Sequence, residues 1–364
     1  MNKTPRLALL VLVAVASAAC RFGSVRRAAP PVQGEAHVAR AMAALELGDL
    51  DRAEAELTLA LEYAPELPTA YNGLGLVARQ RGDKRAAAFY FGRAVQMDDD
   101  LAEAHSNLGA IALEDGDAVT AEERFRSALA IDPGYLEARH NLALTLARRG
   151  DFAAARAHLM RLTSADDDYA DGWAELALVE IALGKRASAE RAIRTTLSLD
   201  ATHATALRAR GDLARAGGDH DAAMADYDTI LEANGADTDA MVSRGVASLV
   251  VGHYAPAVVD LSRAARLAPN NAAARFAYGA VLAATGDDAG AIRELGSAID
   301  LRAAWGASYP AAHLLRAQSR ERLDRSKDAI ADYEAFVDAA EGDPALAEEI
   351  SEAGRRANML RRGR

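Results

Sequence analysis

Residues 116–150 read GDAVTAEERFRSALAIDPGYLEARHNLALTLARRG and run from one glycine to the next in a regular series. The series has a constant period of 34, with members at Gly48, Gly82, Gly116, Gly150, Gly184, Gly218, Gly252 and Gly286. Three other positions repeat with it: a small residue seven places before each glycine, an alanine five places after it, and a large apolar or aromatic residue nine places after it. A fixed period of this length predicts a stack of repeated supersecondary units.

Each repeated position has a physical role in a pair of antiparallel helices. Glycine ends a helix by taking the left-handed conformation, which side chains disfavour, and the aspartate that usually follows it caps the next helix. The small residue and the alanine let the two backbones approach closely, and the large residue packs against the neighbouring unit. One unit would lose on the order of 50 kcal/mol of conformational entropy, more than two short helices offset by burying their own apolar surface. Neighbouring units must therefore supply the missing contacts.

This pattern resembles the tetratricopeptide repeat family, whose repeating unit has the same period and consists of a helix, a turn and a second antiparallel helix. Tyr71 and Trp173 match the family's aromatic position in the first helix, and the family's closing proline is present at Pro65, Pro133 and Pro269. Other units depart from the aromatic position, with His37, His105, Arg139 and Arg275. The resemblance implies an all-α fold, a right-handed superhelical solenoid of about nine helix-turn-helix repeats. Eight of these units are expected in residues 34–305.

The end of the chain continues the pattern with changes. Residues 306–343 are expected to form a ninth, irregular unit, in which Asp324 stands at the glycine position after an insertion of four residues around Trp305. Apolar residues then recur at helical spacing, so residues 344–364 are expected to form a capping helix and a basic tail. We expect this helix to begin at Asp343-Pro344 and to cover the open end of the stack.

The first residues are typical of a bacterial export signal. Residues 1–19 contain two early cations and an apolar run too short to cross a bilayer. Ser17-Ala18-Ala19 before Cys20 resembles a lipobox, although Ser17 departs from the usual leucine. The resemblance implies a lipidated Cys20 that anchors the protein to a membrane, followed by a flexible spacer over residues 20–33.

The same signal leaves the final location open between two cases. Because residue 21 is not aspartate, resemblance to enterobacterial sorting rules favours an outer-membrane lipoprotein that faces the periplasm. Ordinary cleavage after Ala18 would instead give a soluble periplasmic or secreted protein.

Composition and motifs exclude several functional classes. The net charge of −11 and the pI near 5.3 argue against nucleic-acid binding, which needs a concentrated cationic face. No His-Glu-x-x-His, Cys-x-x-Cys or phosphate-binding glycine loop occurs in the sequence. The runs Asp98–Asp100 and Asp166–Asp168 fail the spacing of a calcium loop and are assigned to capping and turns. We therefore expect no catalytic residue, cofactor, metal or small-molecule substrate.

In the resembled family, first-helix side chains line a concave groove, at places that correspond here to ten, six and three residues before each glycine. Neighbouring asparagines are often present there and hold an extended peptide backbone through their amides. Cations in the groove of an acidic protein suit carboxylates, whereas packing between adjacent first helices and solvated charge are the competing interpretations. The candidate groove residues are Asn72, Arg79, Asn107, Leu113, His140, Asn141, Leu144, Arg148, Leu178, Ile181, Arg208, Asp212, Arg215 and Phe276.

The leading functional hypothesis is a non-enzymatic, lipid-anchored scaffold whose partners are other cell-envelope proteins. Its architecture resembles that of the lipoproteins of this family that help pilus secretins to assemble. Two other hypotheses remain: an adaptor for peptidoglycan hydrolases or synthases, and an enzyme whose site carries no recognisable motif.

Overall fold

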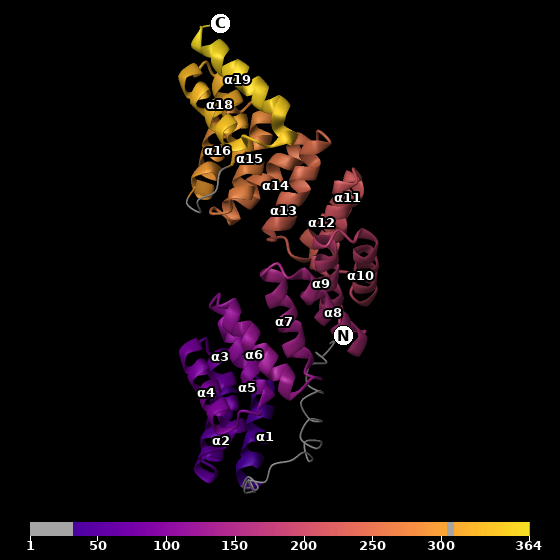
Figure 1. Cartoon of the computed structure of the whole chain (residues 1–364), viewed down its shortest axis with the longest axis vertical. Coiled ribbons are helices and arrows are strands. Elements are labelled where there is room, and N and C mark those ends of the chain that lie inside the picture. Colours follow the sequence, from indigo (N-terminus) through magenta and orange to yellow (C-terminus); the bar gives the residue numbers. More distant parts are fainter. Residues whose placement is uncertain (1–31, 304–308, 364) are drawn as a thin grey trace. The chain divides into compact units, whose positions relative to one another are not determined.

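The computed structural model describes residues 32–303 and 309–363, and within these ranges it contains 19 α-helices, one short 3-10 helix and no strand (Figure 1). The signal peptide, Cys20 and Trp305 lie outside the described residues. The described residues form two compact units, which divide between Asp167 and Asp168. Each is described by itself.

The first unit contains four helical hairpins. Its first helix begins at Val32, two residues before the expected start of the repeats. The helices are α1 (Val32–Glu46), α2 (Leu50–Tyr63), α3 (Pro68–Gln80), α4 (Lys84–Met97), α5 (Ala102–Glu114), α6 (Ala118–Ile131), α7 (Leu136–Arg148) and α8 (Phe152–Ala165).

The second unit contains five hairpins and a final helix. The prediction of nine helix-turn-helix units followed by a capping helix is confirmed for the described residues. The helices are α9 (Ala170–Ala182), α10 (Arg186–Leu199), α11 (Ala204–Ala216), α12 (His220–Ala233), α13 (Thr238–Val250), α14 (Tyr254–Leu267), α15 (Ala272–Thr285), α16 (Asp288–Ala303), α17 (Pro310–Arg322), α18 (Ser326–Ala340) and α19 (Ala347–Arg361).

The turns inside the hairpins have the predicted left-handed glycines and aspartate caps. All eight repeated glycines have φ between 70° and 86°, in the left-handed region. In the ninth hairpin Asp324, which stands at the glycine position, takes the same conformation with φ 55°. Aspartates follow six of the glycines and cap the second helix: Asp83, for example, accepts a hydrogen bond from the backbone N–H of Ala86 at 2.9 Å.

The small and large repeated positions meet inside each hairpin. The large residue is at most 2% exposed in all eight regular units, from Leu57 to Leu295. In the α3/α4 hairpin a Cβ added to Gly75 would lie 2.4 Å from two ring atoms of Phe91. The same ring shares a buried cluster with Ile111 of the next hairpin. The large residue therefore closes its own hairpin and also packs on the neighbouring one.

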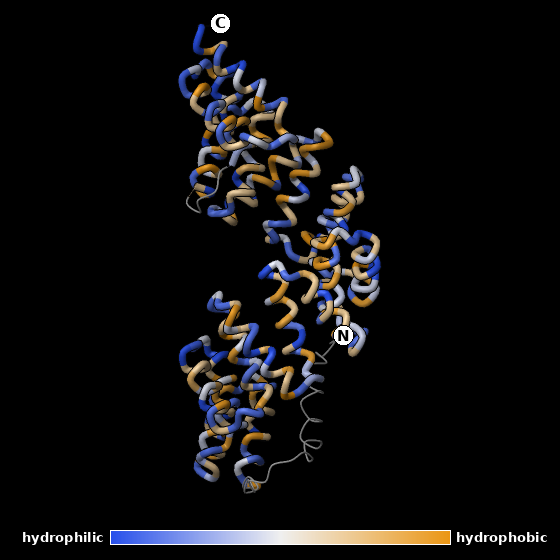
Figure 2. The backbone as a smooth tube through the Cα atoms, in the orientation of Figure 1, coloured by the Kyte–Doolittle hydropathy of each residue, from blue (hydrophilic) through white to orange (hydrophobic). Residues whose placement is uncertain are grey.

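The two helices of a hairpin have different neighbours. Each second helix contacts the first helix of its own hairpin and, in most hairpins, the first helix of the next one. First helices also contact one another directly, as α1 contacts α3, α5 contacts α7, and α9 contacts α11. Figure 2 shows hydrophobic and hydrophilic residues mixed along these helices, which is typical of amphipathic helices packed in a stack. First-helix side chains thus share one face within each compact unit.

The C-terminal cap begins at the predicted residues, but its first turn is a 3-10 helix. Asp343 accepts a hydrogen bond from the backbone N–H of Ala345 at 2.9 Å and starts a 3-10 helix over Pro344–Leu346, and the α-helix begins only at Ala347. Ala353 and Ala357 of α19 are buried in one cluster with residues of α18. The helix therefore covers the last hairpin as expected. In the part of the chain that the structure describes, no helix is long and apolar enough to cross a bilayer.

The tight contact at Gly75 predicts a destabilising effect of a single methyl group. Gly75→Ala should lower the free energy of unfolding, because the overpacking penalty of about 1–3 kcal/mol exceeds the helix-propensity gain of about 1 kcal/mol. Gly92→Ala is the matched control on α4, since its added Cβ meets no atom within 4 Å. It should raise stability by about 0.5–1 kcal/mol. Urea unfolding followed by circular dichroism measures both, and equal effects of the two changes would contradict the packing argument.

Candidate functional site

All the candidate groove residues lie on first helices. In the first compact unit they fall on α3, α5 and α7, and in the second on α9, α11 and α15. Contacts between successive first helices bring neighbouring members of the set together. Because the two units are described separately, the residues form two candidate surfaces. Their role as a peptide groove stays a prediction.

Two asparagines join α3 and α5 on the first surface. The side-chain amide of Asn107 donates a hydrogen bond to the side-chain oxygen of Asn72 at 3.0 Å, and Asn107 is only 8% exposed. This contact uses one amide proton of Asn107 within the chain. Nearby, Nε of Arg79 lies 3.8 Å from a carboxylate oxygen of Glu114 on α5. Both contacts tie adjacent first helices together.

The rest of the first surface mixes polar and apolar side chains. Leu113 of α5 and His140, Asn141 and Leu144 of α7 are partly buried, whereas Arg148 at the end of α7 is exposed. The partial burial of Leu113 and Leu144 agrees with packing between first helices. It also leaves part of each side chain accessible.

On the second surface, Arg208 connects two first helices. One guanidinium nitrogen of Arg208 on α11 lies 3.0 and 2.9 Å from the two carboxylate oxygens of Asp237, and another lies 3.4 Å from Asp239. Asp237 also caps α13 by accepting a hydrogen bond from the backbone N–H of Ala240 at 2.9 Å. The positive charge at Arg208 is therefore met by the next hairpin.

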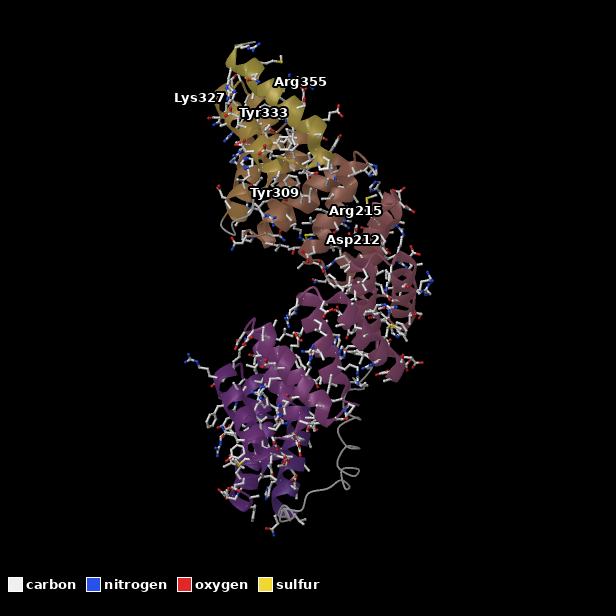
Figure 3. The ribbon with its side chains drawn as sticks, in the orientation of Figure 1. Asp212, Arg215, Tyr309, Lys327, Tyr333 and Arg355 are labelled. Carbon is white, nitrogen blue, oxygen red and sulfur yellow. The ribbon has the colours of Figure 1, made fainter. Side chains whose placement is uncertain are left out.

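Asp212 and Arg215 lie next to each other on α11 (Figure 3). A guanidinium nitrogen of Arg215 donates to Oδ1 of Asp212 at 3.3 Å, and the hydroxyl of Tyr227 donates to the same oxygen at 2.8 Å. Burial, together with the bond to Asp212, raises the pKa of Tyr227 to about 12. Tyr227 thus stays protonated and holds the Asp212 carboxylate in place.

Apolar candidates on the second surface differ in accessibility. Leu178 on α9 is 39% exposed, whereas Ile181 is partly buried. Phe276 on α15 packs against Tyr309, with ring centroids 4.8 Å apart. Leu178 is therefore the most accessible apolar side chain among the candidates.

The predicted preference for carboxylates is weakened by these ion pairs. Arg79, Arg208 and Arg215 each face a carboxylate of this chain. An incoming acidic segment would have to compete with these carboxylates, so the two surfaces suit mixed polar and apolar segments better than strongly acidic ones.

Sequence reasoning missed a set of ion pairs inside the hairpins. An arginine eight places before the left-handed turn residue, which is a glycine or Asp324, pairs with a carboxylate eight places after it, so the partners are 16 residues apart. This spacing was present in the sequence as a recurring opposite charge, and it could have identified the pairs. They are Arg40 with Glu56, Arg210 with Asp226, Arg244 with Asp260, and Arg316 with Asp332.

The Arg244 pair lies between two cavities of the second unit. Arg244 on α13 binds both oxygens of Asp260 at 2.7 Å and Oδ1 of Asp228 at 2.6 Å, and the bond to Asp260 raises its pKa. Cavities of about 230 and 760 Å³ lie on either side of this network, between α12, α13 and α14. Three N–H groups of the Arg244 guanidinium are therefore used by carboxylates of this chain.

A similar network stabilises the last hairpin. Asp332 on α18 lies 2.6 Å from Arg316, 2.6 Å from Arg320 and 3.4 Å from His313. Burial opposes ionisation of Asp332, but the hydrogen bonds from His313 and Arg316 and the nearby arginine charges lower its pKa overall. This carboxylate therefore remains ionised at neutral pH and fixes the orientation of α17 on α18.

The aspartate runs have the turn role that was predicted for them. Asp98 ends α4 and accepts a hydrogen bond from the backbone N–H of Asp100 at 3.2 Å. One carboxylate oxygen from each of Asp98, Asp99 and Asp100 lies within 4.8 Å of the others. Asp166 likewise ends α8. Asp99 and Asp100 are exposed, as is usual for acidic turns without an ion.

Comparison with protein families identifies the chain. Models of the tetratricopeptide repeat match residues 38–101, 72–135, 112–179 and 175–238, which together cover more than half of the sequence. The protein belongs to the tetratricopeptide repeat family, whose members are generally non-catalytic scaffolds for protein–protein interaction. A search of the curated proteins found no match.

Solved structures with the same fold include proteins from several systems. PilF of Pseudomonas aeruginosa has a TM-score of 0.51 at 18% identity, covering 56% of this chain and 92% of its own. PilW, a type IV pilus biogenesis factor, has a TM-score of 0.50 at 24% identity, covering 56% of this chain and 94% of its own. The Cut9-Hcn1 complex of the APC/C gives 0.61 at 17% identity over 78% of this chain, which spans only 55% of that relative. These likenesses show the fold.

Substitutions of Arg244 and Asp260 should have strongly non-additive effects on the free energy of unfolding. Arg244→Leu alone should cost about 2–3 kcal/mol, because it leaves the buried Asp260 carboxylate without its main partner. Adding Asp260→Ala should recover most of this loss, since the α9/α10 hairpin already packs Leu176 and Ala192 at the same two positions. Urea unfolding of the two single variants and the double variant measures the coupling. Simple additivity would mean that the pair does not hold the hairpin together.

Proposed function

We propose that this protein is a membrane-anchored interaction scaffold of the bacterial cell envelope, whose first-helix surfaces bind segments of other envelope proteins. The observation that carries the proposal is the tetratricopeptide repeat stack, which leaves side chains such as Leu178 accessible on its first helices. The mixture of polar and apolar side chains on these helices suits an extended or amphipathic segment. The scaffold needs no cofactor, metal or small-molecule substrate for this role.

The anchoring part of the proposal rests on the lipobox-like sequence before Cys20. Several acyl chains on one cysteine, at about 0.8 kcal/mol per buried CH₂, hold a protein on a membrane essentially permanently. The scaffold would then work at the outer membrane and face the periplasm. Its partners would be envelope proteins that pass or assemble within reach of the tether.

Assembly of a pilus or secretion complex is the specific role we propose. Two proteins of the same fold, PilF and PilW, support it, since PilW is described as a type IV pilus biogenesis factor. The likeness is one of fold, and the role comes to this chain as a proposal. The identity of the bound partner would distinguish this role from that of an adaptor for peptidoglycan hydrolases or synthases.

Lipidation of Cys20 is tested on the mature N-terminus. Acyl labelling in cells should modify the wild-type protein and place it in the membrane fraction, because the acylated cysteine is its anchor. Cys20→Ser should lose both the label and the membrane association. Mass spectrometry should find a mature chain that begins at an acylated Cys20.

The alternative cleavage gives a different mature chain. A protein that begins at Ala19 without an acyl group, and that appears in the soluble periplasmic fraction, would contradict the anchored scaffold. It would leave the interaction surfaces to be tested separately.

Partner binding is tested with two leucines of equal exposure. Leu178 on the first helix α9 and Leu199 on the second helix α10 are both 39% exposed, so changing either to serine should leave stability nearly unchanged. Leu178→Ser should reduce the capture of partners several-fold, because it removes an apolar contact from the proposed binding surface. Leu199→Ser should not. Crosslinking in cells followed by mass spectrometry measures the capture.

The captured proteins decide between the functional hypotheses. Secretin or other pilus components would support the assembly role. Peptidoglycan hydrolases or synthases would replace it with the adaptor role. Equal capture by the Leu178→Ser and Leu199→Ser variants would contradict binding at the first-helix face of the second unit.

A further inference from the structure

The hairpins repeat a second ion pair besides the arginine–carboxylate pair described above. A basic residue eleven places before the turn faces a carboxylate eight places after it, so the partners are 19 residues apart. Three hairpins form this contact, at distances of 2.7, 2.6 and 3.4 Å. They do so through His37 with Glu56, Arg275 with Glu294, and His313 with Asp332.

The α7/α8 hairpin has the basic residue without the carboxylate. Arg139 occupies the position of Arg275, and His158 occupies the position of Glu294. The two arginines are held alike: Arg139 donates to the backbone oxygen of Pro133, and Arg275 donates to that of Pro269 at 3.1 Å. Arg139 is therefore placed to receive a carboxylate at a position where this hairpin supplies an imidazole.

Other cations surround the same point. The pKa of His158 is lowered by burial and by the charges of Arg139, Arg161 and Arg126. Nδ1 of His158 is buried, and none of the residues that the structure describes bonds to it. Burial and Arg161 lower the pKa of Arg139 as well. The position thus concentrates positive charge on a protein whose net charge is −11.

The nearby carboxylates are already engaged. Glu122 on α6 pairs with both Arg126 and Arg149. Asp132, whose charge partly offsets the lowered pKa of Arg139, accepts a hydrogen bond from the backbone N–H of Gly134 at 2.8 Å. Neither replaces the carboxylate that Glu294 provides in the α15/α16 hairpin.

We propose that Arg139, His158 and Arg161 form a site for a glutamate or aspartate side chain of a partner polypeptide. The incoming carboxylate would take the place that Glu294 takes in the α15/α16 hairpin and would bind the guanidinium of Arg139. Arg139 lies on α7, and His158 and Arg161 lie on α8. None of the three is among the candidates on the first-helix face. The inference rests on the proposed scaffold function only in that the ligand comes from a protein.

The test uses a substitution that fills the site from within. A fluorescein-labelled decapeptide of alternating glutamate and alanine should bind the wild-type protein, and its glutamine counterpart should bind more weakly. His158→Glu should weaken binding of the glutamate peptide about fivefold or more, because its carboxylate occupies Arg139. The same variant should have a higher thermal midpoint, since it restores the ion pair of the other hairpins. His158→Gln is the control that removes the imidazole without adding a charge, and it should weaken binding less than His158→Glu does.

The α15/α16 hairpin supplies the reciprocal variant. Glu294→His should create a second unmatched arginine at Arg275 and increase binding of the glutamate peptide. Fluorescence polarisation at low and high salt measures all the affinities, and the preference for glutamate should shrink at high salt.

In the peptide assay, three outcomes would overturn the site. Equal binding of the glutamate and glutamine peptides would remove the carboxylate preference, and unchanged binding by His158→Glu would place the peptide elsewhere. Inorganic phosphate that displaces the peptide at the concentration of the peptide itself would make the site one for free anions. The scaffold function has a separate readout in cells. If His158→Glu captures the same cellular partners as wild type while Leu178→Ser does not, the scaffold stands and the carboxylate site falls.

Discussion

The contact between a small residue in each first helix and a large residue in its partner helix is the constraint on which the rest of the structure depends. Where glycine lies against an aromatic ring, as Gly75 lies against Phe91, a single methyl group has no room. The same large residue reaches the next hairpin, as Phe91 reaches Ile111, so closure within a hairpin and packing between hairpins use one side chain. The register of the stack is therefore set by size at two positions in every repeat.

Because those two positions carry the packing, other positions are free to differ between hairpins. Eight places before the turn, some units have leucine and others have arginine, and a carboxylate then appears 16 residues later to meet the arginine. Leu176 and Ala192 fill the same space without charge in the α9/α10 hairpin. The stack tolerates either the ion pair or the apolar pair at these two positions, provided that a buried charge keeps its partner. Individual units can thus acquire different surfaces while the fold stays constant.

The constant period of the sequence was sufficient to predict the helices, the turns and the place of Asp324 at the glycine position, because each of these depends on one unit at a time. The placement of the candidate groove residues on first helices followed from the same period. Contacts between hairpins were harder to predict from the sequence. Arg208 binds Asp237 of the next hairpin, and this pairing depends on how two hairpins pack against each other. The 3-10 start of the C-terminal cap at Pro344 was missed because proline and helical spacing indicate a helix without specifying its first turn.

Because the hairpins of this chain share one architecture, a hairpin that differs from the others at one position can be compared with them directly. In an isolated fold an unpaired arginine is an ordinary surface feature, but here Arg275 shows what Arg139 contacts when the carboxylate is present. A hairpin that keeps the arginine, keeps its hydrogen bond to the preceding loop and exchanges only the carboxylate loses an internal contact that three sister hairpins retain. The stack does not need that contact to fold, since its packing depends on the small and large positions. The charge that remains is therefore available to a group from outside the chain, which is how a scaffold of repeated units gains a site without changing its architecture.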